Sequence, residues 1–92
     1  MSLERATRPT VPAGEAVILR PRGAPWSLAV TPGDGGSAAV AVSLSDPADA
    51  DVIWHDLDET PLTERRLYLF PGPVAAVRVS ATDAVARVEL MV

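Results

Sequence analysis

The chain contains no cysteine, no lysine, no asparagine and no glutamine. Without cysteine it can form no disulfide, no thiolate metal site and no cysteine nucleophile. The absence of lysine excludes the Gly-Lys-Ser/Thr ending of a phosphate-binding loop, so residues 33–36 (Gly-Asp-Gly-Gly) are interpreted as a hairpin loop. No stretch of about 18 apolar residues occurs, which argues against a transmembrane helix.

Positive charge is also scarce. Eight arginines face twelve acidic residues, and the formal net charge is −4. A nucleic-acid binder would show a basic patch or stripe, so we expect no nucleic-acid partner and no membrane partner. The opening Met-Ser-Leu-Glu-Arg lacks the basic-then-apolar order of a secretory signal, and we expect a soluble chain made in a cytoplasm.

The 92 residues are rich instead in alanine (15) and valine (12). Valine favours the pleated surface of a strand, and nine prolines with six glycines interrupt any long helical pattern. Residues 1–14 show no period and predict an extended N-terminal arm. Residues 15–92 predict a single all-β domain, a small antiparallel β-sandwich of six to seven strands. The expected strands share short apolar runs bounded by turn residues, and they are 15–20, 26–31, 37–45, 51–57, 63–70, 74–81 and 84–92.

The last two runs alternate most regularly, and the link between them, residues 81–84, has hairpin length. The sequence therefore predicts that they pair with each other. The register that keeps both apolar sets on one face places Val77 opposite Leu90 and Val79 opposite Val88.

Chemistry-bearing residues are few. His55, the single histidine, alternates with Trp54 and is interpreted as an exposed strand residue rather than a base or a ligand. The acidic loops at residues 46–51 and 56–59 lack the spacing of a calcium loop and are interpreted as solvated turns. We therefore predict a protein that is not an enzyme and that has no catalytic residues, no metal and no cofactor. A small enzyme or metal-dependent protein centred on His55 and these loops stays as an alternative.

The two tryptophans allow two interpretations. Exposed, Trp26 or Trp54 would form a sugar-stacking platform, which leaves a carbohydrate-binding or adhesion module as an alternative function. Buried, they would anchor a core that is poor in large side chains, and this interpretation is favoured.

The chain from about residue 14 onward resembles small β-sandwich structural proteins of tailed bacteriophages, the capsid decoration or accessory virion proteins. The similar segments are 36–45, the tryptophan strand 51–55, and the Pro-Gly-Pro-Val run within 70–81. The resemblance implies a non-enzymatic role, attachment to a capsid or tail, and a symmetric homo-oligomer located in the virion. Because an arm and a shared strand face are suited to partner contact, the residues expected to contact other proteins are Arg5, Arg8, Pro9, Val11, Tyr68 and Phe70.

Overall fold

The computed structural model describes residues 6–7 and 9–91. Within these ranges the chain forms nine strands and no helix, and so no helix long and apolar enough to span a membrane. Six strands have four or more residues: β3 (Ala16–Leu19), β4 (Trp26–Thr31), β5 (Ser37–Ser43), β7 (Arg66–Phe70), β8 (Ala76–Thr82) and β9 (Ala86–Met91). Three have two residues: β1 (Ala6–Thr7), β2 (Thr10–Val11) and β6 (His55–Asp56).

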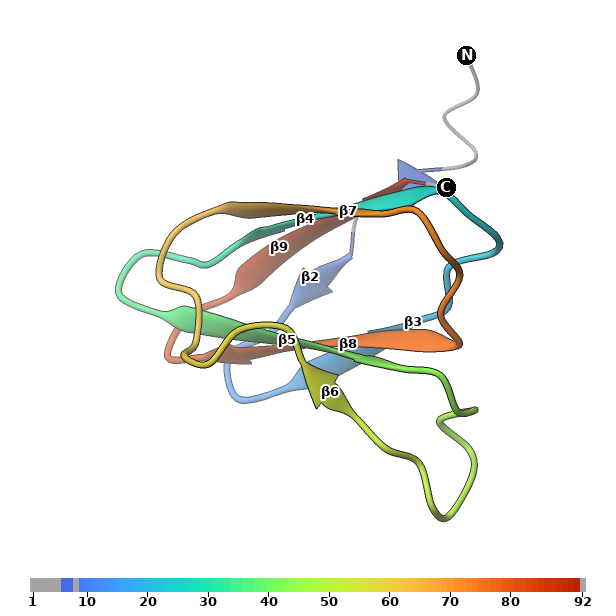
Figure 1. Cartoon of the computed structure of the whole chain (residues 1–92). Coiled ribbons are helices and arrows are strands. Elements are labelled where there is room, and N and C mark those ends of the chain that lie inside the picture. The colour runs from blue at the N-terminus through green and yellow to red at the C-terminus, as the bar shows by residue number, and fades with distance from the viewer. Residues whose placement is uncertain (1–5, 8, 92) are drawn as a thin grey trace.

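The strands form two stacked antiparallel sheets, which appear as the upper and lower layers of Figure 1. The five-stranded sheet has the order β1-β9-β4-β7, and β2 pairs with β9 farther along that strand. The four-stranded sheet has the order β3-β8-β5-β6. The predicted all-β class and antiparallel sandwich are confirmed.

Alternating residues supply the core between the layers. In β4 the side chains of Trp26, Leu28 and Val30 are buried, and β9 alternates buried and exposed residues along its whole length. This period of two is what a strand with one covered face requires. Both sheets contribute inward-facing apolar residues to one core. Its buried members are Val11, Trp26, Leu28, Val30, Ala38, Val40, Val77, Val79, Ala81, Ala86, Val88 and Leu90.

The predicted pairing of the last two strands is wrong. β8 lies in the four-stranded sheet, where it pairs with β3 and β5, whereas β9 lies in the other sheet beside β4. Val77 pairs with Leu19 and Val42, and Leu90 pairs with Thr7 and Leu28, so the two strands face each other across the core. Alternation identifies which residues of a strand share one side. It does not identify the neighbouring strand, because two apolar sides are buried equally well when the strands pair in one sheet and when they lie opposite each other in two sheets.

The loop at residues 33–36 is likewise not a hairpin, because it connects β4 of one sheet to β5 of the other. It packs against another connection between the two sheets, at residues 82–85, which links β8 to β9. A Cβ on Gly36 would lie 2.6 Å from the Ala84 Cβ and 2.7 Å from the Thr82 carbonyl oxygen. Gly33 is equally confined, with a Cβ placed 2.5 Å from the Val85 carbonyl oxygen. The two connections therefore touch because glycines let their backbones approach.

The predicted strand at residues 51–57 is mostly loop, and only His55 and Asp56 pair with β5. Asp46 organises this loop. Its side chain accepts a hydrogen bond from the Ala48 amide at 2.9 Å, and its carbonyl accepts one from the Asp49 amide at 2.9 Å. Such turns are favoured by aspartate because its short side chain can satisfy nearby backbone donors.

Candidate functional site

Exposed apolar side chains gather on the outer surface of the five-stranded sheet. Leu67 and Leu69 in β7 are 63% and 72% exposed, and Met91 in β9 is 45% exposed. Ser27 of β4 pairs with both Leu69 and Met91, and Ala29 pairs with Leu67, so these residues are neighbours across three strands. We call Ala29, Leu67, Leu69 and Met91 the apolar face. A single exposed leucine needs no explanation, whereas several adjacent exposed apolar residues make this surface the candidate for contact with another molecule.

The other side of β7 faces the core. Phe70 lies directly opposite Trp26 in the β4–β7 register, and their rings stack with centroids 4.1 Å apart and planes 10° from parallel. Trp26 is 2% exposed, and its indole Nε1 donates a hydrogen bond to the Gly72 carbonyl oxygen at 3.1 Å. The predicted core role of Trp26 is confirmed, and its burial leaves no open ring face for a sugar.

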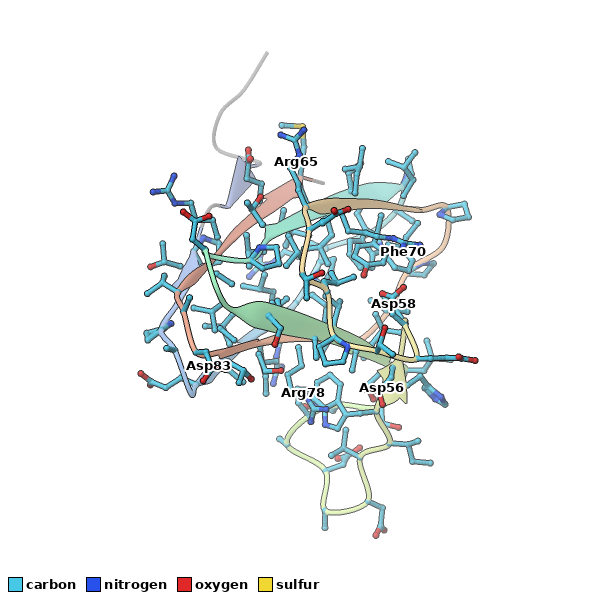
Figure 2. The ribbon with its side chains drawn as sticks, turned by 90° about the vertical axis from the view of Figure 1, so that its left-hand side faces the viewer. Asp56, Asp58, Arg65, Phe70, Arg78 and Asp83 are labelled. Atoms are coloured by element: carbon cyan, nitrogen blue, oxygen red, sulfur yellow. The ribbon has the colours of Figure 1, made fainter. Side chains whose placement is uncertain are left out.

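Tyr68 and Phe70, which the sequence singled out for partner contact, are half-buried on this inward side and pack against the core. Figure 2 shows Phe70 on the side of β7 that faces the other sheet. The leucines of the same strand take the exposed side, and sequence reasoning missed them as contact residues. Alternation correctly placed Leu67 and Leu69 on one side of the strand and Tyr68 and Phe70 on the other. It did not show which side is buried, because both pairs are apolar. The contact role of Tyr68 and Phe70 stays a prediction.

A small polar cluster ties β7 to the loop that precedes it. The Tyr68 hydroxyl donates a hydrogen bond to Asp58 Oδ2 at 2.5 Å, and Arg66 Nη1 lies 3.7 Å from Asp58 Oδ1. The Arg66 guanidinium carbon also lies 5.6 Å from the centre of the Tyr68 ring. Burial, followed by the hydrogen bond to Asp58, raises the pKa of Tyr68 well above its usual range. The Tyr68 hydroxyl therefore keeps its proton in the pH range where a tyrosine usually ionises, and its hydrogen bond connects β7 to Asp58 in the preceding loop.

A shallow hollow of about 150 Å³ lies beside this cluster, between β5 and residues 56–62. Its polar lining consists of Asp56, Asp58 and Glu59 together with Thr60. Among the residues that the structure describes, no group of three or more histidine and acidic side chains is arranged to hold a metal ion. His55 is exposed on β6, as predicted, and does not line the hollow.

Trp54 lies on the outer surface of the four-stranded sheet, outside the core between the layers. It is half-buried, and the Arg78 guanidinium carbon lies 4.7 Å from the centre of its ring. Arg78 alternates with the buried Val77 and Val79, so it points outward, and Figure 2 shows it beside the loop at residues 44–54. The prediction that Trp54 lies in the core is therefore wrong. Trp54 packs on this outer surface, where the Arg78 guanidinium covers one face of its ring.

Of the N-terminal residues predicted to contact a partner, those that the structure describes pack against their own domain and do not form a free arm. Arg5 and Arg8 lie outside the described residues. The Pro9 carbonyl accepts a hydrogen bond from the Val88 amide at 3.0 Å, and Val11 pairs with Ala86. Val11 is 0% exposed, so it fills the core of its own chain and is not available to a partner. Figure 1 shows β2 between the two layers, where an apolar side chain is buried more fully than it would be in an arm.

The candidate site is thus a surface rather than a cleft, formed by the apolar face on the outer side of β7, whereas the Tyr68–Asp58–Arg66 cluster lies on the inward side of the same strand. Its residues come from β4, β7 and β9, which are adjacent in one sheet although they are distant in sequence. No family model, no curated protein and no solved structure matches the chain.

Proposed function

We propose that this chain is a non-enzymatic structural protein of a phage particle, a capsid decoration or accessory protein that acts through protein–protein contacts. The observation that carries the proposal is the apolar face, with Leu67, Leu69 and Met91 exposed on one side of a sheet. The assignment to a virion is supported by the sequence resemblance described above. In this role the chain is made in the bacterial host cytoplasm and becomes part of the particle.

The apolar face suits a large, flat partner. Its central strand, β4, contributes only small side chains: Ser27 lies between Leu69 and Met91, and Ala29 lies between Leu67 and Glu89. Interfaces between proteins bury an apolar centre inside a polar rim, and here Glu89 and Arg87 of β9 together with Thr31 of β4 lie at the border. A capsid or tail protein provides such a surface in many symmetric copies.

The test uses particles of the phage whose genome carries this sequence. Purified particles should contain the chain as a regular component, detected by mass spectrometry after density-gradient separation. Absence of the chain from such particles would overturn the proposal.

Two matched variants test the surface itself. Met91→Glu places a charge on the apolar face, whereas Leu44→Glu makes the same charge change at an exposed residue outside it. When the purified proteins are added to particles lacking the chain, Met91→Glu should bind at least about tenfold more weakly and Leu44→Glu should bind like the unmodified protein. Equal loss, or no loss, in both variants would refute the assignment of the apolar face.

A further inference from the structure

β7 is the longest edge strand in the described part of the chain. The five-stranded sheet ends at β7 on one side and at the two-residue β1 and β2 on the other. The four-stranded sheet ends at β3, with four residues, and at β6, with two. An edge strand presents a row of backbone N–H and C=O groups that can pair with a further strand, and longer edges offer more of them.

Apart from Arg66 at its start, this edge strand carries no charge, no proline and no bulge that would protect it against pairing. Proteins shield edge strands with charges, prolines or bulges. The segment 67–70 reads Leu-Tyr-Leu-Phe, while the arginines at 65 and 66 precede it and Pro71 follows it. The two leucines that flank Tyr68 are also the two most exposed residues of the apolar face.

We propose that β7 pairs with β7 of a second copy of this chain, antiparallel and about a two-fold axis at Tyr68. This register uses all five residues of the strand and leaves Pro71, which has no N–H, outside the paired segment. Leu67 of each copy then lies opposite Leu69 of the other, which brings four leucines together on the outer surface. Arg66 lies opposite Phe70 of the second copy, where a guanidinium and an aromatic ring attract each other.

Charge selects the antiparallel direction. Arg65 and Arg66 both lie at the start of β7, so a parallel pair would place four guanidinium groups side by side. The antiparallel pair moves the two arginine ends apart by four to six residues, roughly 13–20 Å, which exceeds the screening length at physiological salt. The sequence of this edge is therefore complementary to itself in one orientation only.

The pair extends the five-stranded sheet across both copies and leaves its outer surface open. The apolar face is doubled in area without being covered, so a dimer can still contact a larger partner. Pairing at this edge involves only copies of this chain, so it does not depend on the proposed role in a virion.

Sedimentation of the purified full chain tests the dimer. The unmodified protein should sediment as a dimer, and the double variant Leu67→Lys/Leu69→Lys should raise the dissociation constant at least about tenfold, because lysines would then face each other directly. The control variant Leu44→Lys/Ile53→Lys adds the same charge at exposed loop residues outside β7 and outside the apolar face, and it should remain dimeric. All four side chains are exposed, so both variants should keep the far-ultraviolet circular dichroism spectrum of the unmodified protein. A monomeric unmodified chain at concentrations up to about 1 mM would overturn the proposal.

Introduced cysteines test the register, since the chain has none of its own. An equimolar mixture of Leu67→Cys and Leu69→Cys should form a disulfide-linked dimer on mild oxidation, with residue 67 of one copy joined to residue 69 of the other. Each variant oxidised alone should crosslink several-fold less, because identical positions lie one diagonal apart, about 7–8 Å. Dominant joining of residue 67 to residue 67 would contradict the antiparallel register.

Discussion

Replacing Gly36 by alanine is expected to destabilise the fold, and the structure allows its magnitude to be worked out. The added Cβ would meet three atoms of the neighbouring connection at once, at 2.6, 2.7 and 2.8 Å. Two of these atoms, the Thr82 carbonyl oxygen and the Ala84 amide nitrogen, are backbone and cannot swing away. Gly36 does not have a positive φ, so the cost arises from packing alone.

The expected loss of unfolding free energy is about 1–3 kcal/mol, the usual range for forcing a methyl group into a filled space. For a domain of this size it corresponds to a decrease in Tm of roughly 4–24 °C. Urea denaturation followed by tryptophan fluorescence measures it directly, as a lower midpoint with an unchanged slope.

Gly72→Ala is the matched control. A Cβ at Gly72 meets nothing within 4 Å, and this residue also lacks a positive φ. Alanine there should be neutral, or should stabilise by up to about 1 kcal/mol because it restricts the unfolded chain. If Gly36→Ala and Gly72→Ala unfold at the same midpoint, the two connections do not pack as closely as described.

Three further predictions follow from the contacts of the aromatic residues. Trp26→Phe should lower the free energy of unfolding by about 1–3 kcal/mol, because it removes buried ring area and the hydrogen bond to Gly72. Trp54→Phe should lower it by less than about 1 kcal/mol. Equal urea midpoints for the two variants would contradict this difference. The fluorescence of Trp54→Phe, which reports Trp26 alone, should be blue-shifted and resistant to iodide, and ready quenching would show that the indole is not buried. Tyr68 is the single tyrosine, so ultraviolet absorbance should show no phenolate formation near pH 10 in the folded protein, and an ordinary titration there would refute the raised pKa. Because the unfolded chain loses this proton at lower pH than the folded chain, Tyr68 should contribute stability that is complete below about pH 10 and decreases above it.

The local sequence pattern was sufficient to predict where the main strands lie along the chain. The predicted run at residues 26–31 coincides with β4, and the runs at 74–81 and 84–92 contain most of β8 and all of β9. The same alternation separated Leu67 and Leu69 from Tyr68 and Phe70, since a strand directs successive side chains to opposite sides. The sequence by itself thus determined an all-β fold with short strands, and the two sides of each main strand.

Tertiary structure decided how those strands are arranged and which side of each is buried. Val77 and Val79 face the core from one sheet and Val88 and Leu90 from the other, because an apolar strand face is satisfied by burial against any apolar neighbour. Trp26 stacks on Phe70 and thereby turns the leucines of β7 outward, a choice that depends on a residue more than forty positions away. The apolar face and the exposed edge of β7 are consequences of that choice, so they could be recognised only once the two layers were in place.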